Sequence, residues 1–374
     1  VYLVHAFAGS RAGIKSVIVI KKMNAEANKT IDAGVLVYDG HETDPTIEGP
    51  KMYKRNNYYY IFAPAGGVST GWQLVLRSKN IYGPYERRVV MDQGTTTING
   101  PHQGAWLTTQ TGEDWFLHFQ DKDAYGRVVH LQPMKWKNDW PVIGVDKNGD
   151  GKGEPALTYK KPNVEKSYPR STPQESDDFK NNSLGLQWQW QANPKTSWAF
   201  INSSKKGLQL FSDKIPDSAK NYWDVPNILL QKLPAEEFTA TTKLQFKPRL
   251  DGERIGLIIM GASYAYLSLV KKPDGIYLTQ NICMQADKGQ PEKETTIEKI
   301  FGDNIFFKIK VSKGAACNFS YSIDGINYKV AEENFTARPG RWIGAKIGFF
   351  CTRQTQTNDS GSANIYSFTI DKNE

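Results

Sequence analysis

The chain has 374 residues, of which 39% are hydrophobic, 12% aromatic and 23% charged. This length exceeds what one hydrophobic core ordinarily organises, so two domains are expected. The formal net charge is +8, but lysine and arginine are scattered rather than gathered in runs. That pattern favours a solvated basic surface over a nucleic-acid-binding one. No run of 18 apolar residues occurs, so no membrane-spanning helix is expected.

The chain opens directly on an apolar segment, Tyr2 to Phe7, which is typical of a β-strand. No segment with the charge and hydropathy pattern of a signal peptide precedes it. A domain seldom begins in the middle of a strand without a turn before it. We therefore interpret Val1 as a mature or truncated start.

Three aromatic strands recur at a nearly constant spacing in the first half. They are predicted at residues 2–7, 58–62 and 115–119, and their first residues lie 56 and 57 positions apart. Each is followed by a loop and a second predicted strand, at residues 14–20, 72–77 and 127–131. A period in the fifties with about four short strands in each copy is typical of β-propeller blades. Residues 1–165 are therefore predicted to form about three blades.

Two of the three copies are preceded by nearly identical turns, Ile47-Glu48-Gly49-Pro50 and Ile98-Asn99-Gly100-Pro101. The first copy lacks the strand that such a turn should introduce before Tyr2. Propellers are normally built from four or more blades, so three blades leave a propeller incomplete. The sequence predicts either further residues upstream or an open fragment with exposed strand edges.

The long period stops after a polar segment rich in proline, residues 160–173, which is predicted to be a linker. Beyond it, residues 174–374 show short strands with alternating polarity, which predict a β-sandwich. The fold class is thus all-β, a propeller followed by a sandwich. Cys283, Cys317 and Cys351 lie in or beside apolar strands, so they are expected to be core residues. The strands are expected at residues 239–246, 255–260, 265–270, 307–311, 319–323, 343–350 and 365–370, with hairpin turns at 273–275 and 324–325.

The ordered motifs of the first domain resemble glycoside hydrolase family 43. These motifs are Ile47-Glu48-Gly49-Pro50, residues 62–67, residues 77–86, His102-Gln103-Gly104 and Gly126-Arg127. The resemblance implies a five-bladed propeller, of which about three blades are present here, and a concanavalin-like sandwich after it. The family consists mostly of β-xylosidases and α-L-arabinofuranosidases. It therefore implies cleavage of terminal xylosyl or arabinofuranosyl residues of plant hemicellulose such as xylan, without a choice between the two pentoses.

Glu48 matches the general acid of this family, in its Glu-Gly-Pro setting. Inverting glycosidases use one carboxylic acid to protonate the leaving oxygen and a second carboxylate, on the opposite face of the sugar, to activate water. A glutamate on an inner strand at the propeller mouth is expected to be partly desolvated, which favours its protonated form. The alternative is an ordinary surface acid. Asn99 occupies the equivalent place in the next copy, so the turn itself does not require a carboxylate.

The resemblance assigns supporting roles to two further residues. His102 matches the family's axial histidine, which often lies beside a water-coordinated calcium ion, and Arg127 matches the arginine that lines the sugar site. A purely structural histidine and a plain surface arginine are the alternatives. Phe7, Trp72 and Trp106 are candidates for stacking on the sugar ring, with packing inside the blades as the alternative for each.

The base and the aspartate that tunes the acid match no position of this sequence. Asp32, Asp39, Asp121 and Asp123 do not fit either motif. Both residues are expected upstream, so the isolated chain is predicted to be inactive or nearly so. If the 374 residues are complete, the rival function is a non-catalytic carbohydrate-binding protein.

Other acids raise the question of metal binding. The segment from Asp146 to Gly151 resembles the start of a calcium loop, but its twelfth position is Leu157, which excludes an EF-hand and favours a polar turn. In the sandwich, Asp177, Asp178 and Asp371 are candidates for holding a structural calcium ion.

The sandwich has two possible roles. It either supports the propeller and closes one side of the active site, or binds polysaccharide through aromatic platforms. The candidate platforms are Trp188, Trp190, Trp198 and Trp223. A pentose-containing oligosaccharide or polysaccharide is the expected partner in both cases. Such a substrate implies a secreted or periplasmic protein.

Overall fold

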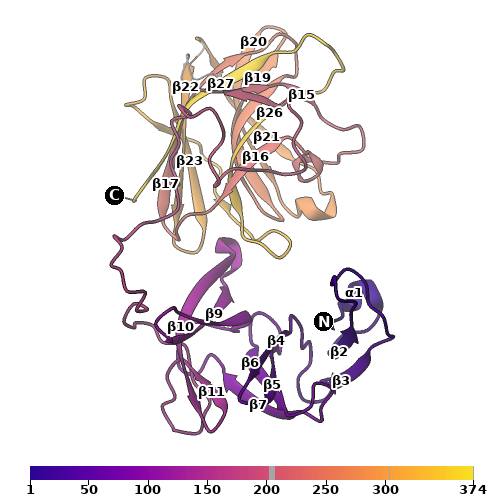
Figure 1. Ribbon diagram of the computed structural model, residues 1–374. Helices are drawn as coiled ribbons and strands as arrows, with labels where there is room; N and C mark the ends of the chain where they lie inside the picture. Colours follow the sequence, from indigo (N-terminus) through magenta and orange to yellow (C-terminus); the bar gives the residue numbers. More distant parts are fainter. Residues whose placement is uncertain (202–206, 303, 374) are drawn as a thin grey trace. The chain divides into compact units, whose positions relative to one another are not determined.

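The computed structural model describes residues 1–201, 207–302 and 304–373. The chain divides into two compact units, residues 1–121 with 127–169 and residues 122–126 with 170–374. The regular secondary structure of both consists almost entirely of β-strands (Figure 1), which confirms the all-β prediction. Among the described residues, no helix has the length and apolar character needed to cross a bilayer.

The first unit holds three antiparallel sheets that follow one another along the chain. Their strand orders are β1-β2-β3, β4-β5-β6-β7 and β11-β10-β9-β8. The predicted aromatic strands are β1, β5 and β9. The bounds are Tyr2–Ala6 (β1), Val17–Lys22 (β2), Val35–Asp39 (β3), Lys51–Arg55 (β4), Tyr58–Ala65 (β5), Trp72–Ser78 (β6), Glu86–Met91 (β7), His102–Thr108 (β8), Asp114–Asp121 (β9), Arg127–Lys137 (β10) and Trp140–Ile143 (β11), with a short helix α1, Gly9–Ala12, after β1.

Two-residue turns join several neighbouring strands, as the sequence chemistry requires. Asn56 and Asn57, with φ values of 46° and 61°, connect β4 to β5, and Asn138 and Asp139, with 53° and 56°, connect β10 to β11. Asparagine and aspartate tolerate this left-handed conformation better than most residues. Strand β2 begins later than predicted because Ser16 takes a φ of 63°, which an extended strand does not allow.

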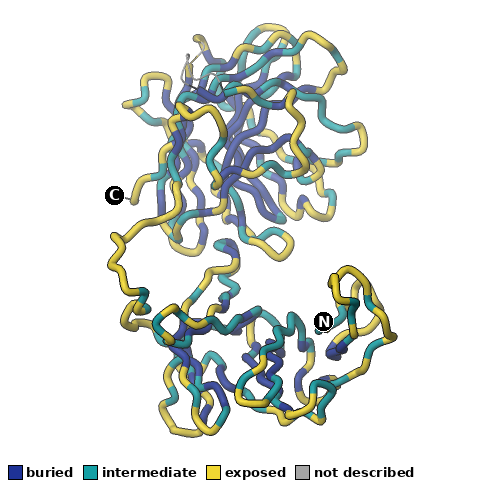
Figure 2. Tube along the Cα trace, in the orientation of Figure 1, coloured by how far each residue is buried: buried dark blue, intermediate teal, exposed yellow. Residues whose placement is uncertain are grey.

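The second sheet is buried on both faces, which explains the continuous aromatic and apolar sequence of β5. Tyr60 and Phe62 pack with Phe116, Met134 and other residues of the third sheet. The alternate residues of β5 point the other way. Ile61, Ala63 and Ala65 pack with Ile18 and Ile20 of the first sheet. A strand between two cores cannot show polar alternation, because successive side chains point to opposite faces. Figure 2 shows this buried middle of the first unit in dark blue.

The three sheets correspond to the three copies of the sequence repeat. The second and third sheets have four strands, and the first has three. Within the described residues, nothing precedes β1 in the way that β4 and β8 precede β5 and β9. The total of five blades in a complete propeller stays a prediction.

In the second unit, the residues that the structure describes form two sheets of eight strands each. Their orders are β12-β16-β26-β18-β19-β20-β21, with β15 beside β26, and β13-β14-β27-β17-β22-β23-β24, with β25 beside β23. The bounds are Gln189–Trp190 (β12), Ala199–Ile201 (β13), Leu208–Phe211 (β14), Asp213–Lys214 (β15), Ile228–Lys232 (β16), Phe238–Lys247 (β17), Arg254–Met260 (β18), Tyr264–Lys272 (β19), Gly275–Cys283 (β20), Lys293–Ile300 (β21), Asn304–Ser312 (β22), Ala316–Ser322 (β23), Lys329–Val330 (β24), Phe335–Thr336 (β25), Lys346–Arg353 (β26) and Ser362–Asp371 (β27), with 3-10 helices η1 (Asp123–Tyr125), η2 (Tyr222–Asp224) and η3 (Ala286–Lys288).

Period-two alternation correctly identified the strands with one solvated face. In β22, Ile305, Phe307, Ile309 and Val311 are buried while Lys310 is exposed. Strands β16, β20 and β21 were missed, and buried residues on both faces of β20 leave no alternation to detect. Strand β26 starts at Lys346, three residues later than predicted. The three cysteines are unpaired and buried, as predicted.

Residues 122–126, which the prediction placed in the first domain, belong to the second unit. The hydroxyl of Tyr125 donates to the carbonyl of Glu236 at 3.2 Å and accepts the backbone N–H of Ala315 at 2.7 Å. The backbone N–H of Ala345 donates to Ala124 at 2.7 Å. These contacts link residues far apart in sequence, so no local pattern could reveal them.

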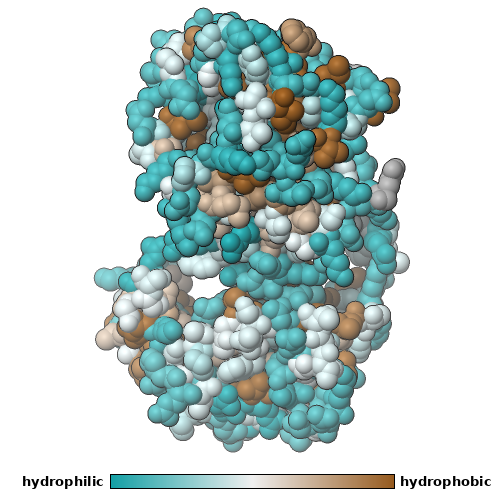
Figure 3. Space-filling model, turned by 180° about the vertical axis from the view of Figure 1, so that it is seen from behind, coloured by the Kyte–Doolittle hydropathy of each residue, from teal (hydrophilic) through white to brown (hydrophobic). Residues whose placement is uncertain are grey.

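The surface of the protein is mainly polar. On the face seen in Figure 3, hydrophobic residues form small separate groups among hydrophilic ones. The most exposed large apolar side chains, such as Leu186, Phe301 and Ile326, belong to the second unit. Isolated apolar residues of this kind are normal on soluble protein surfaces.

Candidate active site

The loop that carries Glu48 is fastened to the second sheet by one buried carboxylate, Asp44. Arg87 donates to both oxygens, from Nε to Oδ2 at 2.6 Å and from Nη2 to Oδ1 at 2.7 Å. Trp72 Nε1 donates to Oδ1 at 3.0 Å, and the hydroxyl of Tyr38 donates to Oδ2. Asp44 is fully buried, and burial opposes its ionisation. The hydrogen bonds from Arg87, Tyr38 and Trp72 outweigh that effect and lower the pKa of Asp44.

Backbone contacts then fix Glu48 itself. The N–H of Glu48 donates to the carbonyl of Pro64 at 3.1 Å, and the N–H of Gly66 donates to Pro45 at 2.8 Å. The preceding Ile47 is buried in the core between the first two sheets. Glu48 lies in the loop just before β4, not on the strand as predicted, because Gly49 takes a φ of 52°. Its side chain is 46% exposed, so the desolvation is partial and the carboxyl can reach a ligand.

Two residues at the start of β8 contact this carboxyl. Gln103 Nε2 donates to Glu48 Oε1 at 3.1 Å. His102 Nε2 lies 3.7 Å from the same oxygen, and the imidazole is fully buried. Burial lowers the pKa of His102, although the charge of Glu48 opposes that shift. A neutral imidazole at 3.7 Å forms no strong ion pair, so His102 lies beside the Glu48 carboxyl as an uncharged group.

Arg127, the first residue of β10, completes the group. Its guanidinium lies over the ring of Phe119 on β9, 4.6 Å from the centroid, and the His102 ring is 6.1 Å from that of Phe119. The charge of Arg127 also contributes to the lowered pKa of His102. The structure thus brings together three sequence-predicted residues, Glu48, His102 and Arg127, from a loop and two strands. An exposed guanidinium fork suits the vicinal hydroxyls of a sugar.

Trp72 and Trp106, predicted as stacking candidates, are both engaged within the sheets. Trp72 donates to Asp44. Trp106 Nε1 donates to Asp114 Oδ1 at 2.8 Å, and its ring packs with Tyr53 and Trp136. These contacts favour the alternative, packing inside the blades. Phe7 contacts the ring of His5 at 4.9 Å, and its proposed contact with sugar stays a prediction.

Among the described residues, no three His, Cys, Asp or Glu side chains gather closely enough to hold a metal ion. Asp146 accepts the backbone N–H groups of Gly149 and Gly151, at 2.8 and 3.0 Å, so this segment is the predicted polar turn. Asp177 accepts Phe179 N and Trp188 Nε1 on its two oxygens, which disfavours a calcium ion there. At His102, neither ring nitrogen has a hydrogen-bond partner of ordinary geometry. A buried neutral imidazole of this kind fits a partner such as metal-bound water.

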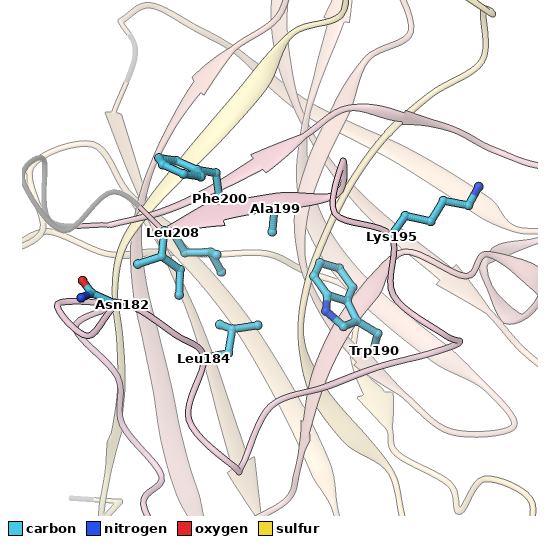
Figure 4. Close-up of a pocket in the computed structure, with 8 residues that line it drawn as sticks. Asn182, Leu184, Trp190, Lys195, Ala199, Phe200 and Leu208 are labelled. Carbon is cyan, nitrogen blue, oxygen red and sulfur yellow. The ribbon is translucent and has the colours of Figure 1, made fainter.

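The tryptophans of the second unit serve mainly as core residues. Trp188 packs against Phe349 and Phe368, and Trp198 is buried and donates to Asp213 at 2.7 Å. Trp190 lines a pocket of about 280 Å³. Figure 4 shows its indole facing the same space as Leu184 and Leu208. The lining is largely apolar, with few groups that could hydrogen bond to sugar hydroxyls.

Two residues that matter to the site were not singled out from the sequence. Asp44 acts through Arg87, 43 positions away, and no local spacing connects them. Gln103 was part of a recognised motif, but its hydrogen bond to Glu48 crosses 55 positions. The site therefore combines a partly exposed carboxyl, a hydrogen-bonding amide, a neutral imidazole and a guanidinium. When it is protonated, the carboxyl of Glu48 can donate its proton to a bound polar ligand.

The two units match two known sequence families. Residues 1–141 match the family described as glycosyl hydrolases family 43, and residues 176–371 match the β-xylosidase C-terminal concanavalin A-like domain. These matches confirm the resemblance seen in the motifs. They also confirm that residues after the linker form a concanavalin-like sandwich.

Individual relatives agree with the family matches. A protein of Xylanibacter ruminicola named as a candidate β-xylosidase is 40% identical over 339 residues, covering 90% of this chain and 60% of the relative. A non-reducing end α-L-arabinofuranosidase of Bacteroides ovatus is 28% identical over 229 residues, covering 57% of this chain and 41% of the relative. The chain therefore spans less than two thirds of the length of either relative.

Solved structures confirm the fold. A xylan β-1,4-xylosidase from Bacillus halodurans superposes with a TM-score of 0.84 at 20% identity, over 99% of this chain and 74% of that structure. At this identity the likeness concerns architecture alone. It supports a propeller-type unit followed by a sandwich, as the repeat predicted.

Proposed function

Because the chain belongs to glycosyl hydrolases family 43, we propose that it carries the acid-bearing part of an inverting glycoside hydrolase. The enzyme removes terminal pentosyl residues from plant hemicellulose such as xylan. One observation supports this assignment above all. Glu48 lies on an anchored loop, keeps its carboxyl partly exposed, and is contacted by Gln103 and His102.

In the proposed reaction, Glu48 gives its proton to the glycosidic oxygen as the bond from that oxygen to the sugar carbon breaks. A second carboxylate takes a proton from water, and the resulting hydroxide oxygen bonds to the sugar carbon from the opposite face. Gln103 holds one oxygen of the acid, and the buried neutral imidazole of His102 lies 3.7 Å from the same oxygen. Arg127 binds sugar hydroxyls through its guanidinium.

We propose that the water-activating base and the tuning aspartate come from sequence outside these 374 residues. The longer lengths of the relatives support this, since the chain spans 60% of the Xylanibacter protein. So does the first sheet, which has three strands where the next two have four.

The xylosyl group is our first choice of substrate. The 40%-identical relative and the matched C-terminal family both carry the β-xylosidase description. An arabinofuranosyl group is the second candidate, supported by the Bacteroides relative. A non-catalytic carbohydrate-binding role is the rival function if the base is missing from the natural protein.

Two further expectations belong to this proposal. A hydrated calcium ion would be held through water by His102, whose unprotonated ring nitrogen can accept a hydrogen bond from a water ligand of the ion. Such an ion would supply a positive charge that orients bound water. A polysaccharide substrate also implies that the protein works outside the cytoplasm, in a secreted or periplasmic setting.

Product analysis tests the function directly. The full-length protein is incubated with xylobiose and with an aryl α-L-arabinofuranoside, and the first-formed sugar anomer is followed by proton NMR. We expect free pentose whose anomeric configuration is opposite to that of the substrate. Binding of xylo-oligosaccharide without release of pentose would instead establish the carbohydrate-binding alternative.

A further inference from the structure

Gln103 occupies a conformation that its residue type does not favour. Its φ is 52°, in the left-handed region that is unfavourable for a residue with a side chain. It lies where the register of β8 against β9 shifts between His102 and Ala105. Such a bulge leaves a residue outside the ladder and re-aims its side chain. Here the amide is aimed at Glu48, with Nε2 3.1 Å from Oε1.

Neighbouring glycines make room for this arrangement. A side chain at position 49 would collide with the Gln103 amide, and Gly49 itself has a φ of 52°. A side chain at position 104 would collide with the ring of Phe116, which lies beneath the bulge. Both glycines therefore accommodate the approach of Gln103 to Glu48. The hydrogen bond from Gln103 to Glu48 thus depends on a strained residue, a β-bulge and two glycines.

We propose that Gln103 is a positioning residue that holds the acid Glu48 in its proton-donating orientation, and that stability is lost at position 103 to achieve this. The inference rests on the proposed function of Glu48. The amide N–H binds Oε1, so the transferable proton resides on Oε2. During bond cleavage that proton passes to the glycosidic oxygen, and Oε1 remains held by Gln103.

The leaving group of the substrate distinguishes positioning from a general structural role. A poor leaving group such as the sugar of xylobiose needs full protonation of its oxygen, whereas dinitrophenolate departs with little help from an acid. We expect Gln103→Met, which keeps the side-chain length but has no amide, to lower kcat on xylobiose about 10-fold or more. On 2,4-dinitrophenyl β-D-xyloside the loss should stay below about threefold, with KM nearly unchanged on both substrates.

The stored strain is tested separately by thermal unfolding of the full-length protein, in which the kinetic constants are also measured. Glycine adopts a positive φ freely, so Gln103→Gly should raise Tm by about 2–4 °C while lowering kcat on xylobiose as Gln103→Met does. The matched control is Gln285→Gly. Gln285 is an exposed glutamine of the second unit with a φ of 54°. Its replacement should raise Tm similarly and leave both kinetic constants unchanged.

Several outcomes decide between the explanations. Equal losses on xylobiose and on the dinitrophenyl substrate would overturn the positioning role, as would an unchanged kcat in Gln103→Met. A fall in Tm for Gln103→Gly would overturn the strain component. Glu48→Gln serves as the reference and should show the same leaving-group dependence in stronger form. If Glu48→Gln shows no such dependence, the proposed function itself fails, and the role of Gln103 fails with it.

Discussion

At the residue scale, buried polar groups decide the shape of the candidate site. Asp44, Arg87 and Trp72 come from three separate segments of the first unit, and their hydrogen bonds fix the loop before Glu48. Glu48, His102 and Arg127 could be chosen as candidates from the sequence because each belongs to a recognisable motif. Asp44 could not be chosen in this way, because a bidentate pair formed across 43 positions has no local pattern.

Asp44→Asn removes the charge that Arg87 and Tyr38 contact. Removing one partner of a buried ion pair commonly lowers the free energy of unfolding by about 3–5 kcal/mol. Because Arg87 is partly exposed, we expect Asp44→Asn to lower it by an amount at, or somewhat below, the lower end of that range. Urea unfolding of the first unit measures it. Asp39→Asn is the control, since the partner of Asp39, His41, is exposed. Equal stability of Asp44→Asn and the parent protein would contradict the anchoring role.

The lowered pKa of Asp44 also fixes the direction of its pH dependence. Its folded-state pKa lies below the ordinary value of 3.8. The stability it contributes is therefore complete above about pH 4 and is lost as the pH falls through the folded-state value. The Asp44→Asn variant should show a weaker loss of stability in strong acid than the parent protein.

His118 contributes a pH dependence of the same sign as Asp44, but it begins at a higher pH. Burial lowers its pKa to about 4 from the ordinary 6.5, aided by the neighbouring His130. The unfolded chain therefore binds a proton at a higher pH than the folded chain does. Stability is complete above about pH 6.5 and falls as the pH drops toward 4, by about 3 kcal/mol in total.

His118→Gln should flatten the unfolding free energy of the first unit between pH 7 and pH 4.5. His41→Gln, at an exposed position, should leave the slope unchanged. If the unfolding free energy of His118→Gln falls with pH as steeply as that of the parent protein, groups other than His118 cause the acid sensitivity.

At the element scale, alternation and turn chemistry predicted much of the architecture. The aromatic strands β1, β5 and β9 and the hairpins of the sandwich follow from local pattern. Strands such as β20 do not, because polar residues on one of its faces are buried as well. Arg254 explains why. Its Nη1 lies 3.2 Å from Asn281 Oδ1 and 3.3 Å from Ser268 Oγ, and its Nη2 lies 2.5 Å from Glu294 Oε2.

Arg254 thus joins four neighbouring strands, β18 to β21, through one buried guanidinium. We expect Arg254→Met to lower the unfolding free energy of the second unit by about 3 kcal/mol, because Glu294 and the strand hydroxyls lose their donor. Chemical denaturation followed by tryptophan fluorescence measures the change. Arg341→Met, beside the exposed Trp342, is the control. A loss in Arg254→Met no larger than in the control would mean that the network adds nothing.

At the scale of the whole molecule, the repeat predicted a propeller-type unit and the end of the repeat predicted a sandwich. The division between them was less exact. Residues 122–126 belong to the second unit through the contacts of Tyr125 with Glu236 and Ala315. A short segment with long-range partners carries no composition signal, so only the structure assigns it.

The proposed origin of the base leads to a prediction for the isolated chain. With no second carboxylate assigned opposite Glu48, the 374 residues alone should hydrolyse neither aryl β-D-xyloside nor aryl α-L-arabinofuranoside at a useful rate. The full-length protein, measured in parallel, should hydrolyse at least one. Robust turnover by the isolated chain that Glu48→Gln removes would mean that the base lies within it after all.

The most direct test of the account is the effect of Glu48→Gln on xylobiose hydrolysis by the full-length protein. Glutamine preserves the shape of the side chain but cannot supply the proton. We predict a fall in kcat of about 10²–10⁴-fold, with an unchanged Tm because the Glu48 side chain is partly exposed. Glu86→Gln, on the same unit and more exposed, should retain full activity. Unimpaired hydrolysis by Glu48→Gln would contradict the central claim.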